Sequence, residues 1–172
     1  MSISSKEDWV IFQDVLDLSP IGCLTVNLQI KNRFLTRLIL STGPLDAKVK
    51  MYFPSLSAHL KSYLLRSNLS SFPLPIFVCG SLFEKRVWSE CLKIPPGNTI
   101  SYGELAQRIS CRSPMAVGQA LKRNPLPIII PCHRVVAKDG GLTGFSCGIE
   151  IKKILIEFEK SGVSAHENSH NE

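Results

Sequence analysis

The residues of this chain that could do chemistry gather around one cysteine, in the segment Pro131-Cys132-His133-Arg134. Cys132 follows the apolar residues 128–130, which we expect to form a buried extended segment. A thiol between a proline that fixes the backbone and an adjacent His and Arg is in a setting that can favour the thiolate, its nucleophilic form. A Cys-His pair alone proves little, because a free cysteine is usually an inert small apolar residue.

A carboxylate near the C-terminus supplies a third group for this site. The buried face of a predicted helix is set there by apolar residues at helical spacing: Ile151, Ile154, Leu155 and Phe158. Glu159 lies at the edge of that face, and a partly buried carboxylate must be paired or hydrogen-bonded. Glu159 could orient His133, and His133 could take the proton of Cys132 directly or through water. Cys132, His133 and Glu159 would then be the nucleophile, the base and the orienting group. A solvated charge near the helix end is an equally good interpretation of Glu159 at this point.

The charge balance predicts an anionic partner. The formal net charge is +6 and the pI is near 9.1, so polyanions should be attracted, with nucleic acid as the first candidate. Ribosomal and membrane-surface proteins share this bias. Residues 80–160 hold 12 Lys and Arg against 7 Asp and Glu, so most of the excess lies in the C-terminal half. We therefore expect the partner to bind there.

The cysteines indicate free thiols rather than a metal site. The six cysteines are scattered, with no Cys-x-x-Cys pair and no Cys/His spacing typical of zinc sites. The chain opens without a charged and then apolar signal segment, and no apolar run approaches the length of a membrane span. We expect a reducing, cytoplasmic compartment, or the nucleus in a eukaryote, and no membrane partner.

The composition and patterning predict a mixed α/β chain with a small N-terminal domain, residues 1–75, that contains strands. The full chain has 172 residues, 44% of them hydrophobic, which is enough for a normal buried core. Residues 22–30 and 33–40 alternate as strands do, and residues 51–66 can form a helix. The Ser- and Pro-bearing stretch 67–75 reads as the connection to the next domain.

The remainder, residues 76–163, is expected to be a mainly helical domain. Residues 81–94 carry apolar side chains at helical spacing, and Ser101-Tyr102-Gly103-Glu104 is a capping box that begins another helix. Ser113-Pro114 places a capping serine before a proline at the first helical position. We expect both chain ends, residues 1–6 and 164–172, to be polar and disordered.

The helix expected at residues 114–123 has two different faces. One is apolar: Ala116, Val117, Ala120 and Leu121. The other is polar or small and left for a partner: Met115, Gly118, Gln119 and Lys122. Two short helices joined by a brief turn, with Arg123 beside the second, form a helix-turn-helix candidate. By itself this pattern belongs more often to an ordinary amphipathic surface helix.

Several motifs, in order and spacing, resemble those of the O6-alkylguanine-DNA alkyltransferases. These are Ile94-Pro95-Pro96-Gly97, Ile100-Ser101-Tyr102-Gly103-Glu104-Leu105-Ala106, Ala116-Val117-Gly118, Asn124-Pro125, Ile130-Pro131-Cys132-His133-Arg134-Val135-Val136 and Gly144-Phe145-Ser146. The similarity covers about residues 80–160, and the Pro-Cys-His-Arg-Val segment is highly specific. The first 80 residues show no clear match, and that family often carries a variable N-terminal domain there.

The resemblance implies roles for the site residues. Cys132 would accept the alkyl group irreversibly, His133 would act as base through a water molecule, and Glu159 would orient His133. Asn124 would support the hydrogen-bond network behind the site. Tyr102 would hold the phosphate beside the flipped nucleotide and assist proton transfer to the leaving guanine. No metal or organic cofactor is needed, and because a thioether lacks a good leaving group, each molecule would act once.

The resemblance also implies how substrate is held. The helix from Pro114 would enter the minor groove of duplex DNA, and the damaged base, O6-alkylguanine or O4-alkylthymine, would be flipped into a pocket. The implied DNA contacts are Met115, Ala116, Gly118, Gln119, Lys122, Arg123 and Arg134. The implied substrate pocket comprises Val135, Phe145, Ser146 and Cys147. We expect the protein to act as a monomer.

Three residues depart from the family pattern. Met115 stands where the family usually has an intercalating arginine, so it would serve as an apolar wedge that cannot hydrogen-bond to the orphaned base. Phe145 mildly replaces a tyrosine. Cys147 stands where glycine is common, and its side chain would narrow the pocket toward small alkyl groups.

Two alternatives belong to other classes of protein. A lesion-binding protein that does not repair fits Met115, but such relatives lack the acceptor cysteine, and Cys132 is present. A Cys-His hydrolase would require a directly shared proton. Adjacent residues of an extended segment point to opposite faces, so Cys132 and His133 do not suit that reaction.

Overall fold

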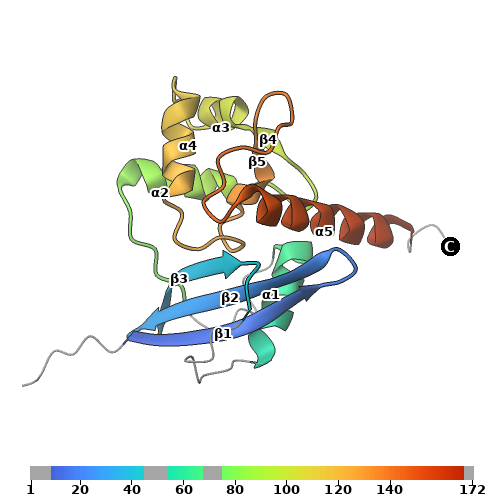
Figure 1. Ribbon diagram of the computed structural model, residues 1–172. Coiled ribbons are helices and arrows are strands. Elements are labelled where there is room, and N and C mark those ends of the chain that lie inside the picture. Colours follow the sequence, from blue (N-terminus) through green and yellow to red (C-terminus); the bar gives the residue numbers. More distant parts are fainter. Residues whose placement is uncertain (1–8, 45–53, 68–74, 169–172) are drawn as a thin grey trace, which may run out of the picture.

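The structure, a computed structural model, describes residues 9–44, 54–67 and 75–168. Within these residues a three-stranded antiparallel sheet with one helix comes first, and a cluster of four helices with a two-stranded parallel sheet follows (Figure 1). The predicted mixed α/β class is confirmed. The segment 1–6, expected to be frayed, lies outside the described residues.

The N-terminal sheet has the order β1-β2-β3, with β1 (Trp9–Leu18), β2 (Gly22–Lys31) and β3 (Phe34–Ser41). The strands predicted at residues 22–30 and 33–40 are confirmed, whereas β1 was not predicted. β2 and β3 meet at a two-residue turn, Asn32-Arg33, in which both φ angles are positive, at 51° and 70°. Such turns match the right-handed twist of a hairpin.

One face of this sheet is buried under α1 (Pro54–Arg66), as the alternation of the strands requires (Figure 1). Leu60 and Leu64 of the helix are fully buried in the same core as Leu28 of β2. Asp14, on β1, accepts a hydrogen bond from the backbone N–H of Ser57 at 3.0 Å. This carboxylate satisfies an amide near the start of α1 and ties the helix to the sheet.

The second part consists of three short helices, one long helix and turns around the apolar residues that follow residue 80. Its elements are α2 (Leu82–Cys91), β4 (Ile100–Ser101), α3 (Tyr102–Arg108), α4 (Pro114–Lys122), the 3-10 helix η2 (Cys132–Arg134), β5 (Val135–Val136) and α5 (Ile149–Asn168). β4 and β5 pair in parallel, which brings the start of α3 beside the end of η2. None of the helices in the described ranges is both long and apolar enough to cross a membrane.

Side-chain caps fix where the helices of this part begin. The capping box predicted at Ser101 is present, with the N–H of Glu104 donating to the Ser101 hydroxyl and the Glu104 carboxylate accepting from the N–H of Ser101. Ser113 caps α4 by accepting from the N–H of Ala116 at 3.2 Å, with Pro114 at the first helical position. The predicted α3-turn-α4 arrangement therefore forms.

Three local predictions are wrong. Residues 128–130 are buried as expected, but they lie in a tight turn, with Ile128 at φ 73°, instead of an extended segment. Cys132 and His133 lie in a 3-10 helix and not in a strand. Helix α5 continues to Asn168, so residues 164–168 belong to a helix and not to a disordered tail. Residues 169–172 lie outside the described residues.

Candidate active site

Cys132 lies at the start of η2, where Asn124 holds its sulfur in place. The Asn124 side-chain NH₂ donates to the Cys132 Sγ at 2.9 Å and to the carbonyl of Ile130 at 2.8 Å, while its oxygen accepts from the N–H of Leu126 at 2.9 Å. Asn124 is itself buried, so all three bonds are shielded from water. One amide therefore fixes both the turn at residues 124–131 and the sulfur that follows it.

The surroundings of Cys132 disfavour a resting thiolate, contrary to the expectation from its neighbours in sequence. Cys132 is 5% exposed, and burial raises the pKa of its thiol to about 12. The hydrogen bond from Asn124 lowers this pKa, but by less than burial raises it. The positive charge of Arg134 does not serve this sulfur, because the guanidinium is bound to Glu159. A nucleophilic Cys132 therefore requires a base that takes its proton during the reaction.

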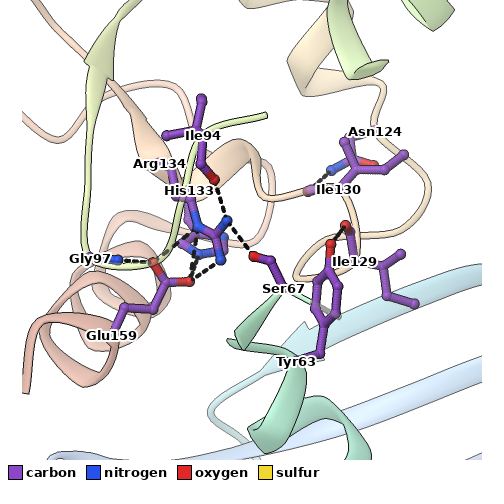
Figure 2. Close-up of polar contacts among 10 residues, drawn as sticks. All are labelled: Tyr63, Ser67, Ile94, Gly97, Asn124, Ile129, Ile130, His133, Arg134 and Glu159. Carbon is purple, nitrogen blue, oxygen red and sulfur yellow. Dashed lines mark hydrogen bonds and ion pairs between the residues drawn. The ribbon is translucent and has the colours of Figure 1, made fainter. Parts of the chain in front are cut away.

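The two residues that follow Cys132, His133 and Arg134, form a buried charge cluster with Glu159 of α5 (Figure 2). The Nε2 of His133 lies 2.7 Å from the Oε1 of Glu159, and the Arg134 Nη2 donates to the same oxygen at 2.8 Å. All three side chains are at most 1% exposed. Although burial opposes ionisation, the His133 ring and the Arg134 guanidinium hold the pKa of Glu159 below its usual value.

This arrangement leaves the other ring nitrogen of His133 available. The Nδ1 atom is buried and has no hydrogen-bond partner among the described residues. If Nε2 donates its proton to Glu159, Nδ1 carries the lone pair and can accept a proton. No direct hydrogen bond joins His133 to Cys132 in the described contacts, so a bridging water suits the transfer better than a direct one.

The backbone of the Ile94-Pro95-Pro96-Gly97 motif binds the same charge cluster. The carbonyl of Ile94 accepts from the Arg134 Nη1 at 2.5 Å, and the N–H of Gly97 donates to the Glu159 Oε2 at 3.1 Å (Figure 2). Gly97 adopts φ 75°, a conformation that favours glycine. The loop after α2 thus supplies backbone partners that buried charges need.

The expected contact of Arg134 with DNA is wrong. Its side chain is fully buried, and its guanidinium donates to Glu159, to the carbonyl of Ile94 and to the hydroxyl of Ser67. Such a guanidinium has no surface for a phosphate. Its charge instead stabilises the carboxylate that orients His133.

Tyr102, the first residue of α3, lies between α4 and the loop at residues 140–148. A Cβ atom added at Gly118 would lie 3.8 Å from the ring of Tyr102, and one added at Gly144 would lie 3.0 Å from the Tyr102 hydroxyl. The hydroxyl donates to the carbonyl of Thr143 at 2.8 Å, and burial raises its pKa. Tyr102 therefore sits where the predicted DNA-contacting helix meets the loop of the predicted substrate pocket.

Lys152 of α5 anchors that loop and was missed by sequence reasoning. It is fully buried, and its Nζ donates to the carbonyls of Val135 at 2.6 Å and Thr143 at 3.0 Å. Burial lowers its pKa to about 8, and its Nζ lies 5.7 Å from the centroid of the Tyr102 ring. A lysine on the apolar face of a predicted helix, one residue after Ile151, was the signal that could have identified it.

The predicted pocket residues divide into two groups. Val135 is fully buried and its carbonyl is occupied by Lys152, so it offers no surface to a base in this structure. Phe145 and Cys147 are half-buried, and Ser146 is exposed on the same loop. The expected contact between Val135 and a base is therefore not supported, whereas the other three remain accessible candidates.

Helix α4 presents the face that its sequence predicted. Val117, Ala120 and Leu121 are buried, while the side chain of Met115 is 78% exposed. The other residues proposed to contact DNA are exposed or half-buried: Ala116, Gly118, Gln119, Lys122 and Arg123. Arg123 also pairs with Glu84 at 3.2 Å.

Within the described residues, no group of three His, Cys, Asp or Glu side chains could hold a metal ion.

Comparison with known proteins gives a consistent family. Residues 82–161 match the family described as "6-O-methylguanine DNA methyltransferase, DNA binding domain". A methylated-DNA–protein-cysteine methyltransferase of Methanosarcina mazei is 39% identical over 115 residues, which cover 66% of this chain and 72% of that protein. This chain belongs to the methylated-DNA–protein-cysteine methyltransferase family.

Solved structures of the methyltransferase family extend the likeness beyond the helical part. An O6-methylguanine methyltransferase of Mycobacterium tuberculosis is 35% identical, with a TM-score of 0.64 over 88% of this chain and 94% of that one. One from Pyrococcus kodakaraensis is 27% identical, with a TM-score of 0.70 over 87% and 99%. Coverage of 87–88% of the chain extends into the first 80 residues, for which the sequence showed no clear match.

Proposed function

We propose that this protein repairs DNA by transferring the alkyl group of O6-alkylguanine in a duplex to the sulfur of its own Cys132. The observation that supports this proposal most is that Asn124 holds the buried thiol of Cys132 next to a His133–Glu159 pair that can take the thiol proton. Relatives named methylated-DNA–protein-cysteine methyltransferase, and a Mycobacterium tuberculosis relative solved in complex with DNA, support this assignment. O4-alkylthymine is a further candidate substrate.

The proposed reaction balances without a cofactor. The thiol proton of Cys132 passes through a water molecule to the Nδ1 of His133, and Glu159 stabilises the imidazolium that forms. The sulfur bonds to the alkyl carbon as the bond from that carbon to O6 breaks. The electron pair stays on guanine, which takes up a proton from solvent with the assistance of Tyr102 and is restored, while Cys132 becomes a thioether. Because a thioether has no good leaving group, each molecule acts once.

DNA binding in this proposal uses α4 in the minor groove. The alkylated base is flipped out of the stack, at a cost of a few kcal/mol that stacking and gap filling must recover. The exposed Met115 is placed to fill the gap as an apolar wedge. Tyr102 holds the adjoining phosphate, which requires its hydroxyl to exchange the carbonyl of Thr143 for the nucleotide.

We assign the catalytic and DNA-binding unit to residues 76–163 and the variable unit to residues 1–75, and we propose that a monomer acts in the cytoplasm. Monomeric action suits a site whose acceptor, base and orienting carboxylate all come from one chain.

Titration of lesions against protein tests single turnover. A duplex carrying one O6-methylguanine is mixed with increasing protein, and restored guanine is measured after digestion. We expect repair to reach a plateau at one lesion per protein molecule, with none for Cys132→Ser. Continued repair beyond one equivalent would contradict the proposal.

A lesion-binding protein without repair is the second candidate, favoured by Met115 in place of an arginine. It predicts binding of the modified duplex with no restored guanine at any ratio. The same titration therefore separates the two functions.

A further inference from the structure

A cleft of about 930 Å³ separates the edge of the N-terminal sheet from the chain that follows α4. One wall is formed by β2 and β3, and the other by residues 122–127 and by Ser146 and Cys147 of the pocket loop. We call it the sheet cleft. It borders the site at Asn124, Ser146 and Cys147, and the proposed function leaves its sheet wall without a role.

The sheet cleft carries positive charge. The described residues that line it include no Asp or Glu, but they include Arg37 on the sheet side and Lys122 and Arg123 opposite. Arg123 is partly neutralised by Glu84, in a solvent-exposed pair of small energetic value. A low-dielectric cleft lined by one sign of charge concentrates ligands of the opposite sign. The occupant should therefore be anionic.

Two aromatic rings lie in the same cleft with much of their surface exposed. Phe34 is 42% and Phe77 is 57% exposed, and their ring centroids are 6.2 Å apart in an edge-to-face arrangement. Ile39, also in the lining, is 40% exposed. Basic residues that track a phosphate backbone, combined with exposed aromatic rings on which bases stack, form the recognition mode of single-stranded nucleic acid. A duplex fits less well, because its bases are already stacked on each other.

We propose that the sheet cleft binds a segment of single-stranded DNA, with bases stacked on Phe34 and Phe77 and a phosphate near Arg37. DNA is chosen over RNA because the cleft is continuous with Ser146 and Cys147 of the proposed repair site, so this choice rests on the proposed function. The N-terminal sheet would then hold unpaired DNA while α4 serves the duplex.

Thiol footprinting tests the location directly in the wild-type protein. Cys79 is exposed and lines the sheet cleft, whereas Cys23 is exposed on β2 outside it. The rate at which iodoacetamide labels each cysteine is measured by peptide mass spectrometry, with and without a saturating short oligothymidine. We expect labelling of Cys79 to slow several-fold and labelling of Cys23 to be unchanged. Equal rates at Cys79 with and without DNA would overturn the proposal.

Binding measurements with matched variants test the energetics. Fluorescence anisotropy with labelled oligothymidine at fixed low salt should show about fivefold or greater weakening for Phe77→Ala and for Arg37→Glu. Two variants at exposed sites outside the cleft lining, Leu82→Ala and Lys153→Glu, control for lost apolar surface and reversed charge and should bind as wild type does.

Three other results would overturn the proposal. Tighter binding of oligouridine through the same residues would assign the cleft to RNA. A fall in oligomer size for Phe77→Ala, with no effect on oligothymidine, would assign it to a second copy of the chain. Equal weakening by the control variants would assign the affinity to general charge. Repair of a duplex lesion is measured on the same variants and should be unchanged, so failure of this inference is distinct from failure of the proposed repair reaction.

Discussion

The hydroxyl of Tyr63, on α1, donates a hydrogen bond to the backbone carbonyl of Ile129 at 2.8 Å, inside the turn that leads to Cys132 (Figure 2). The same turn contains Ile128 at φ 73°, a costly conformation for a β-branched residue. The N–H of Leu38 on β3 holds the turn from a second point, at the carbonyl of Pro125. The N-terminal part therefore constrains the backbone that presents the acceptor.

Tyr63→Phe removes the hydroxyl and leaves the buried carbonyl of Ile129 without that partner. We expect a loss of about 1–3 kcal/mol of folding free energy and slower alkyl transfer at saturating DNA, because the turn is less well held. Urea unfolding and single-turnover rates measure the two effects. Wild-type stability together with a wild-type rate would show that this bond does not support the site.

Glu159→Gln keeps the shape of the side chain and removes the charge between His133 and Arg134. Breaking a buried ion pair costs about 3–5 kcal/mol, and the transfer rate should fall because the imidazolium loses its partner. Glu157→Gln is the matched control, since that side chain is 47% exposed on the same helix. Equal effects of the two substitutions on the transfer rate would refute a special role for Glu159.

The lowered pKa of Glu159 also sets a pH dependence of stability. A carboxyl whose folded pKa lies below its unfolded value stabilises the fold above the unfolded pKa, and this contribution is lost as pH falls through the folded pKa. We therefore expect the wild type to lose stability as the pH falls below about 4.3, the ordinary pKa of a glutamate, and Glu159→Gln to lose less over that range. Parallel acid-unfolding curves would be inconsistent with this linkage.

The thiol of Cys132 should react slowly with general alkylating reagents. Burial raises its pKa to about 12, so little thiolate exists near pH 8, whereas Cys23 and Cys79 are exposed. In the free protein, iodoacetamide should label Cys132 after both of these residues, as resolved by peptide mass spectrometry. Fastest labelling at Cys132 would mean that a resting thiolate is present.

Met115→Arg should speed base flipping and tighten binding to the modified duplex, because arginine can hydrogen-bond to the orphaned base and methionine cannot. Fluorescence of 2-aminopurine beside the lesion reports the flipping rate. Ser89→Arg adds the same charge at an exposed position of α2 and controls for non-specific attraction. An equal gain from both variants, or no gain from Met115→Arg, would refute the wedge interpretation.

Cys147→Gly should speed transfer from a bulky benzyl adduct more than transfer from a methyl adduct. Cys147 is half-buried on the pocket loop, so removing its side chain widens the space near the acceptor. Single-turnover rates on the two substrates give the ratio. An unchanged ratio would show that Cys147 does not limit the size of the alkyl group.

Local chemistry made the helical part predictable. Ser101 and Glu104 cap α3, and Ser113 with Pro114 begins α4, because each signal acts within one turn of the chain. The position of Glu159 on its helix allowed either a partner for His133 or a solvated charge, and the family resemblance favoured the His133 partner that the structure shows.

Features that depend on distant contacts were not predictable in the same way. Arg134 looked like a DNA ligand because nothing in its neighbourhood reveals that the carbonyl of Ile94 and the hydroxyl of Ser67 would enclose it. The sequence at Ile128 predicts a strand because three isoleucines favour extended structure, whereas hydrogen bonds from Asn124, Tyr63 and Leu38 hold it as a turn. The raised pKa of Cys132 likewise follows from tertiary burial.

The alkyl group should end on the sulfur of Cys132. Intact-protein mass spectrometry follows wild type and Cys132→Ala after each is mixed with a duplex carrying one O6-methylguanine, and peptide mapping then locates any modification. We expect wild type to gain the mass of one methyl group replacing one hydrogen, on the peptide containing Cys132, with equal loss of the lesion and no change in the variant. Binding of the lesion without any gain in mass, or a methyl group on another residue, would contradict it.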